Sequence, residues 1–235
     1  AKEVEIDDVK ELLDQMIACN TAIAQEGMHG DYGANIGKVI AIRKDLPSLL
    51  KAYAAAGSDA RMNGCELPVV INSGSGNQGL TVSVPLIIYA EREHLDKEKL
   101  YRALVISNLT AIHLKTEIGR LSAFCGAVSA GAACGAGLAY LKDASEEVMN
   151  HTIVNALAIT SGIICDGAKA SCAAKIAVSV EAGILGYDMY MNGQQFYGGD
   201  GIISKGIENT IHNIGVLGSQ GMASTDQEII KIMCE

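Results

Sequence analysis

The stretch LSAFCGAVSAGAACGAGLAYL, residues 121–141, gives the clearest indication of the fold. It carries no charged side chain over a length that could cross a bilayer, which takes about 20 residues. Most of its residues are Ala, Gly, Ser and Cys, however, and a helix with so few Leu, Ile or Phe would insert weakly into lipid. Small side chains instead let neighbouring helices approach closely. We therefore expect a buried central helix and no association with membranes.

The rest of the chain favours further helices around this segment. Apolar residues recur at helical spacing in residues 8–26, and Gly27 is expected to end that helix. Only 3 Pro and no Trp occur, so few residues interrupt helices. Further helices are expected at residues 38–43, 46–56, 80–91, 97–115, 145–164, 169–182, 202–217 and 224–233.

These patterns predict an all-α fold of closely packed, Gly- and Ala-rich helices. A turn-rich loop is expected at residues 27–37, where glycines are dense, and one short β segment at residues 69–71. We find no internal repeat and no break in composition. Residues 1–235 are therefore expected to form a single helical domain.

Charge and length limit the function further. The 235 residues contain 18 Lys and Arg against 27 Asp and Glu, a net charge of −9, and no basic block. This composition argues against nucleic acid and anionic membranes as partners. The charged start AKEVEIDD has no apolar signal region, which predicts a cytoplasmic protein without disulfides. Because the first residue is Ala1 and not Met, the chain is expected to be processed or excised from a longer one.

Seven cysteines are many for such a protein and suggest metal binding or catalysis. Cys19, Cys65 and Cys134 are expected to be small buried hydrophobic residues. Cys165 and Cys172 flank a loop, and Cys125 lies in FCGAVSAG. Three thiolates are suited to iron–sulfur or zinc, and without a nearby fourth ligand a three-thiolate cluster would leave one iron open as a Lewis acid. The alternative is that all three are core cysteines.

The segment NSGSGNQG, residues 72–79, predicts an anion-binding loop. Its glycines expose backbone N–H groups just before a helix, and such groups bind carboxylates or phosphates. The polar side chains in it are candidate substrate ligands: Asn72, Ser73, Ser75, Asn77 and Gln78. It matches neither a P-loop nor a dinucleotide-binding fingerprint. The alternative is an ordinary polar loop that caps the following helix.

A general base is harder to find. The five histidines are scattered, and His29, in the glycine-rich loop, is the single candidate that the sequence offers. No Ser-His-Asp order or paired carboxylates are visible.

Three long motifs, in order, resemble one known family. ARMNGCELPVVINSGSGNQGLTVSVPL, GRLSAFCGAVSAG and SGIICDGAKASCAAK are similar to segments of the serine dehydratase α-chain-like family, which includes L-cysteine desulfidases. The similarity runs through essentially the whole chain, including the tail at residues 225–233. The resemblance implies an oxygen-sensitive lyase that uses a [4Fe–4S] cluster and no pyridoxal phosphate. Such a lyase converts cysteine or serine to pyruvate and ammonia, with sulfide or water as the other product.

The resemblance also assigns residues. By motif, Cys125, Cys165 and Cys172 are the cluster ligands, and residues 72–78 bind the carboxylate and amino group of a small amino-acid substrate. The residues between two of the ligands are candidates for hydrogen bonds to the cluster sulfurs: Asp166, Lys169 and Ser171.

Family members are about twice this length, with a further N-terminal half ahead of the first helix. The resemblance therefore implies a cluster-binding half whose partner, the missing half, is expected to carry the base. Cys234 is penultimate, and by analogy with related dehydratases it is a candidate for the active site. The glycine-rich helices also suggest a homodimer. The competing hypothesis is a non-catalytic, thiol-rich helical module that binds zinc or senses redox state.

Overall fold

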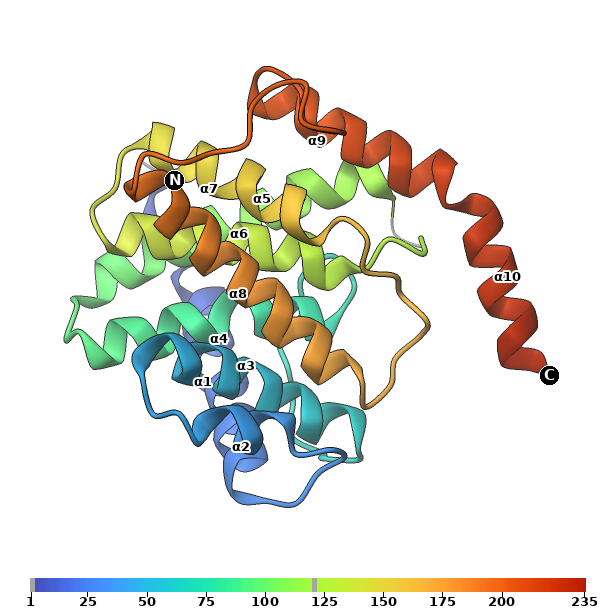
Figure 1. Cartoon of the computed structure of the whole chain (residues 1–235). Coiled ribbons are helices and arrows are strands. Elements are labelled where there is room, and N and C mark those ends of the chain that lie inside the picture. Colours follow the sequence, from blue (N-terminus) through green and yellow to red (C-terminus); the bar gives the residue numbers. More distant parts are fainter. Residues whose placement is uncertain (1–2, 120–121) are drawn as a thin grey trace.

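The computed structural model describes residues 3–119 and 122–235 (Figure 1). In these residues the chain is helical, and the two β-bridges are isolated pairs that form no sheet, which confirms the all-α prediction. The helices are α1 (Ile6–His29), α2 (Ile36–Ala41), α3 (Leu46–Met62), α4 (Gly76–Arg92), α5 (Lys97–Ile118), α6 (Gly126–Leu141), α7 (Glu146–Thr160), α8 (Cys172–Met191), α9 (Ile207–Val216) and α10 (Ala223–Cys234), with a π-helical turn, η1 (Leu217–Gly221), after α9.

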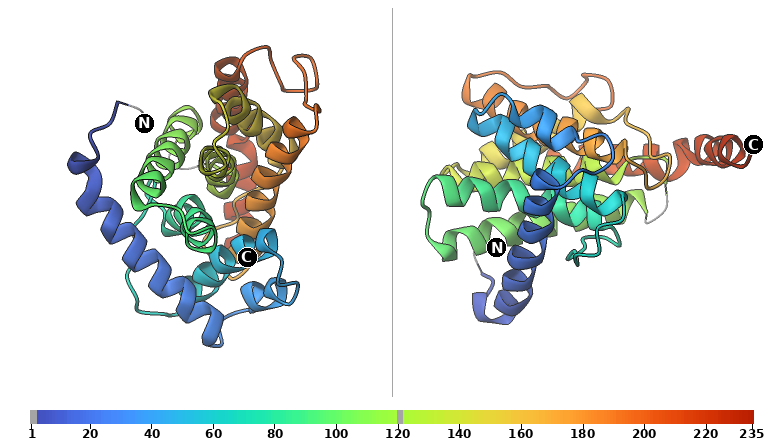
Figure 2. Two further views of the ribbon diagram at one scale, coloured as in Figure 1. Left: turned by 90° about the vertical axis from the view of Figure 1, so that its left-hand side faces the viewer. Right: turned by 90° about the horizontal axis from the view of Figure 1, so that it is seen from below.

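Helix α6 lies at the centre and contacts α4, α5, α7 and α8 (Figure 2). Its small residues permit this close packing. A Cβ atom on Gly131 would lie 2.3 Å from the carbonyl oxygen of Ser179 on α8, and one on Gly137 would lie 2.6 Å from the Leu86 side chain on α4. The prediction of a buried central helix is thus confirmed. None of the helices in the described part of the chain has the length and apolarity that crossing a bilayer requires.

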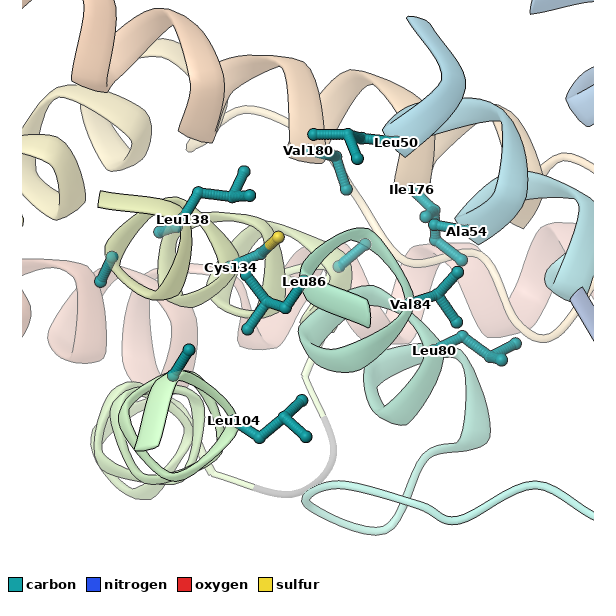
Figure 3. Packing of buried hydrophobic residues seen from close by; sticks show 14 of the residues in the cluster. Leu50, Ala54, Leu80, Val84, Leu86, Leu104, Cys134, Leu138, Ile176 and Val180 are labelled. Atoms are coloured by element: carbon teal, nitrogen blue, oxygen red, sulfur yellow. The ribbon is translucent and has the colours of Figure 1, made fainter. Parts of the chain in front are cut away.

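The hydrophobic core surrounds α6 (Figure 3). Leu86 of α4, Leu104 of α5 and Cys134 of α6 are fully buried in it. Cys134 therefore behaves as the apolar residue that the sequence suggested, and Cys65 is half-buried against the same core. Cys19 is also half-buried, so it is less enclosed than we expected.

Several helix ends differ from the sequence predictions. Helix α1 continues through Gly27 to His29, because Gly27 is not a cap: a Cβ there would lie 2.0 Å from the Ala56 carbonyl oxygen, so the glycine allows α1 and α3 to touch. The loop predicted at 27–37 is correspondingly shorter, and α2 begins within it. Helix α4 begins at Gly76, four positions before the predicted start, because Ser75 caps it by accepting a hydrogen bond from the Gln78 N–H.

The segment at residues 69–71 forms no strand. Its backbone bonds go to a side chain instead: the Val70 N–H donates to Asn20 Oδ1 at 2.9 Å, and the Asn20 amide donates to the Val70 carbonyl at 3.2 Å. The segment is thereby attached to α1, and it leads directly into the polar loop that follows.

The helices around the predicted cysteine ligands also end differently. Helix α6 begins at Gly126 rather than at position 121, which lies outside the described residues, and residues 122–125 are not helical. Helix α7 ends at Thr160 and α8 begins at Cys172, so residues 161–171 form a connection. Helix α10 projects from the body of the molecule and buries none of its residues (Figures 1 and 2).

Candidate functional site

An antiparallel pairing brings two of the cysteine motifs together. The Cys125 N–H donates to the Ile163 carbonyl at 3.1 Å, and the Cys165 N–H donates to the Ala123 carbonyl at 2.6 Å. Phe124 and Ile164 form the isolated bridge between these two bonds. Cys125 and Cys165, which are 40 positions apart in the chain, therefore become neighbours with adjacent thiols.

Cys172 is the first residue of α8 and closes the same connection. Its sulfur lies 3.5 Å from the Lys169 N–H and 3.6 Å from the Gly167 carbonyl. Lys169 therefore contacts this thiol through its backbone, while its side chain, like that of Ser171, is exposed. Gly167 has a φ of 95°, a left-handed conformation that glycine adopts without steric cost.

The polar loop folds back on itself at the start of α4. Asn72 and Ser75 exchange backbone hydrogen bonds of 3.1 and 2.9 Å, and the turn between them has φ values of 48° at Ser73 and 80° at Gly74. Asn72 is buried and is held by α5, since its amide donates to Asn108 Oδ1 at 2.9 Å. Asn72 thus holds the turn in place and does not line the cavity described next.

A cavity of about 340 Å³ unites these elements. The three cysteines and four of the five predicted loop residues line it. Its three cationic residues were not among those predicted from the sequence. The lining includes Arg61, Ser73, Ser75, Asn77, Gln78, Lys115, Cys125, Cys165, Cys172 and Lys175.

Polar side chains at the start of α4 are oriented by their neighbours. Asn77 Oδ1 accepts hydrogen bonds from Ser58 Oγ at 3.2 Å and from Arg61 Nη1 at 3.3 Å. The Gln78 amide lies against Gly126, where an added Cβ would be 2.6 Å from its Nε2. Gln78 Oε1 is buried without a hydrogen-bond partner in the described residues, so it is available to a bound molecule.

The adjacent thiols titrate as a pair. The hydrogen bond from Cys125, more than the Gly167 N–H or the Lys175 charge, lowers the pKa of Cys165 to about 6. The pKa of Cys125 is raised, because its proton is shared with Cys165 and because it is buried. The lowered pKa favours the thiolate form of Cys165, which is the form that binds metal.

Three helix N-termini meet at the cavity: Ser75 caps α4, Cys125 caps α6, and Cys172 begins α8. Each helix N-terminus carries a partial positive charge and unpaired N–H groups. Lys175 lies beside them and is ion-paired with Asp166. This ion pair lowers the pKa of the Asp166 carboxyl. The cavity is therefore built to receive negative charge.

Known proteins support one family assignment. The family model described as "Serine dehydratase alpha chain" matches residues 1–231. The chain belongs to the serine dehydratase alpha chain family. It is 64% identical to a UPF0597 protein of Desulfitobacterium hafniense over 99% of this chain and 55% of that protein. It is 52% identical to a UPF0597 protein of Lachnoclostridium phytofermentans over 99% of this chain and 56% of that protein.

The chain therefore spans about half the length of these curated relatives. No solved structure matches it. The family expected from the three motifs is confirmed by these matches, and the names of the relatives specify neither a substrate nor a cofactor.

The donor chemistry of the cavity fits the iron–sulfur cluster that the family resemblance implies. Three thiols line one space, and cluster ligands bind different iron atoms, so they surround a volume. In the described residues no three Cys, His, Asp or Glu side chains converge closely enough to hold a single metal ion.

Two residues that the sequence singled out are not among those that line the cavity. His29 is exposed at the end of α1, its Nδ1 lies 2.7 Å from the Gln25 carbonyl oxygen, and it does not line the cavity. Cys234 is exposed on α10. Three cations that line the cavity were not predicted from the sequence. Arg61 and Lys175 lie within the motifs that resemble the family, so the motifs could have pointed to them. Lys115 lies outside these motifs and resembles any lysine near a helix C-terminus.

Proposed function

We propose that this chain is the cluster-binding catalytic part of a lyase of the serine dehydratase type. Its substrate would be L-cysteine or L-serine. Elimination of the α-proton and the β-substituent gives aminoacrylate with sulfide or water, and hydrolysis of aminoacrylate gives pyruvate and ammonia. Family membership supports the lyase class, and the choice of amino acid is part of the proposal.

The observation that carries this proposal is the shared cavity. The thiols of Cys125, Cys165 and Cys172 would hold a [4Fe–4S] cluster. When bound, the cluster would supply a Lewis acid at the iron that has no protein ligand, which assists departure of the β-substituent. The polar start of α4 lines the same cavity of about 340 Å³.

The chain's own residues then bind and orient the substrate. Ser75 Oγ accepts a hydrogen bond from the Gln78 N–H, which leaves its hydroxyl proton for a ligand oxygen. The unpartnered Gln78 Oε1 is an acceptor for the substrate ammonium group. Asn77 is fixed by Arg61 and presents its remaining polar atoms to the same region.

The proposal extends to the setting of the reaction. We propose that the chain is one helical domain that carries the cluster. Its seven free cysteines are consistent with a reducing compartment, the cytoplasm. We further propose that the additional sequence of the longer relatives acts as a partner segment and supplies the base that removes the α-proton. A homodimer is compatible with the proposal but is not required by it.

Anaerobic reconstitution with iron and sulfide tests the cluster. We expect about four irons per chain in the parent and a clear loss in Cys165→Ser. Cys134→Ser is the matched control, since Cys134 is buried on α6 away from the cavity and should keep its iron. Iron that is retained in Cys165→Ser, or absent from the parent, would contradict the ligand assignment.

Pyruvate formation tests the reaction. Together with the partner segment that supplies the base, the iron-loaded chain is expected to form pyruvate from L-cysteine or L-serine, and the more efficient of the two is its substrate. Stoichiometric zinc in place of iron, without pyruvate from either amino acid, would favour the alternative of a zinc-binding or redox-sensing module.

A further inference from the structure

Lys115 is a lysine buried at the wall of the candidate site. Its exposed fraction is 6%, although it lies near the end of α5, three residues before the last helical residue, Ile118. It lines the cavity that contains the thiols, and it also lines a second hollow of about 600 Å³ together with Ser73, Gly74 and Thr116. Lys115 and the Ser73–Gly74 turn thus border both spaces.

No acidic side chain pairs with Lys115 in the described residues. Its neighbour in the cavity, Lys175, is different, because Lys175 forms an ion pair with Asp166 and donates to the Ile164 carbonyl at 3.0 Å. Buried lysines are rare unless they are paired, since removing an ammonium group from water is costly. Lys115 therefore lacks a counter-charge that the fold supplies to Lys175.

Burial lowers the pKa of Lys115, and the thiols of Cys165 and Cys125 oppose this shift only in part. An anion bound beside Nζ would restore the stability of the charged form. The approach is open on the side of the turn, because a Cβ on Gly74 would have no atom within 4 Å. Ser73, the other residue of the turn, is tied to Asn72 by a hydrogen bond of 2.8 Å, which fixes the turn opposite Lys115.

We propose that Lys115 binds the α-carboxylate of the amino-acid substrate. The identity of the anion rests on the proposed function, whereas the need for an anion rests on the burial of Lys115. The thiolates themselves are the competing source of negative charge. The two sources differ in a measurable way, because the substrate carboxylate can be removed from the ligand while the thiols stay in place.

The test uses L-alanine and L-alaninamide as probes of the iron-loaded chain. L-Alanine has no β-substituent to eliminate, so calorimetry measures binding without turnover, and the amide differs from it by the missing carboxylate charge. The parent should bind L-alanine about 10 to 100 times more tightly than the amide, as expected for one charge-assisted hydrogen bond. Lys115→Met should bind both probes with similar affinity.

Two further variants control for folding and for charge. Lys115→Arg keeps a cation and should retain part of the preference for L-alanine. Lys99→Met removes a lysine of the same helix that pairs with Asp143 and lies outside both cavities. This variant should retain the full preference for L-alanine. Circular dichroism of each variant confirms that it is folded.

A preference for L-alanine that persists in folded Lys115→Met overturns the proposal. So does a folded Lys115→Met chain that loses iron together with the preference, because Lys115 would then be the counter-charge of the thiols. A parent that shows no preference for the carboxylate also overturns it. A parent that shows the preference but forms no pyruvate, even with the partner segment present, refutes the lyase and leaves the carboxylate site standing.

Discussion

Replacing Asn20 with Ala should detach the segment that leads into the candidate site. Asn20 is fully buried on α1, and its amide donates to Ser83 Oγ at 2.9 Å and to the Val70 carbonyl at 3.2 Å, while its oxygen accepts from the Val70 N–H at 2.9 Å. The three bonds connect α1 with α4 and with the residues just before the turn at Asn72. Without the Asn20 side chain, both backbone groups of Val70 lose their partner.

The size of the effect follows from these bonds. Each contributes about 0.5–1.5 kcal/mol net, so Asn20→Ala should lower the free energy of unfolding by about 2–4 kcal/mol. For a chain of this length that corresponds to a fall in Tm of about 4–16 °C. Ser83→Ala removes one of the three bonds and the bond from Ser83 Oγ to the Gly79 carbonyl, and should cost about 1–2 kcal/mol.

Urea unfolding followed by circular dichroism measures both variants and the double variant. The double variant should lose less than the sum of the single losses, because the two side chains share a hydrogen bond. A loss below about 1 kcal/mol in Asn20→Ala, or strictly additive losses, would refute the assignment of Asn20 as the anchor of this segment.

Three further results are expected in thermal unfolding. Gly131→Ala should destabilise the protein by about 1–3 kcal/mol, because its Cβ would lie 2.3 Å from a backbone oxygen, whereas Gly162→Ala, with open space around it, should change stability by less than about 0.5 kcal/mol. Equal effects would contradict the close packing of α6. Burial raises the pKa of the Asp59 carboxyl above its usual value of 3.8, so this carboxyl ionises more readily in the unfolded chain than in the folded one. The Tm of the parent should therefore fall relative to that of Asp59→Asn as pH rises above 3.8. A difference in Tm that does not change with pH would contradict this. Deleting residues 223–235 should cost less than about 0.5 kcal/mol, since α10 buries no residue, and a larger loss would mean that α10 packs in solution.

The sequence predicted the central helix and its end at Leu141 correctly but placed its start too early, for a physical reason. A run of Ala and Gly encodes close approach wherever it lies in the chain, so α6 could be recognised from composition alone. Residues 122–125 and 161–165 leave their helices in order to pair with each other, and a pairing across 40 positions leaves no local pattern. Pro85 is a local helix-breaking residue that does not end its helix. It lies inside α4, where tertiary packing outweighs the cost of the missing N–H.

The parts of the candidate site that lie in the sequence motifs could be predicted. Four of the five loop residues and the three cysteines come together at one cavity. Asn72 belongs to the loop but serves to hold it, a distinction that needs the contact with Asn108. Lys115 could not be found from the sequence, because lysines on helices usually face solvent and only the packing of α5 buries this one.

The charge of the cavity is opposite to that of the chain, and this contrast identifies the kind of molecule it holds. The whole chain has a net charge of −9, yet the described lining residues of the cavity include Arg61, Lys115 and Lys175 and no carboxylate. Three helix N-termini add partial positive charge at the same place. Such a concentration of positive charge favours the binding of anions. Thiolates would supply part of that negative charge, and under the proposal for Lys115 the substrate carboxylate would supply the rest.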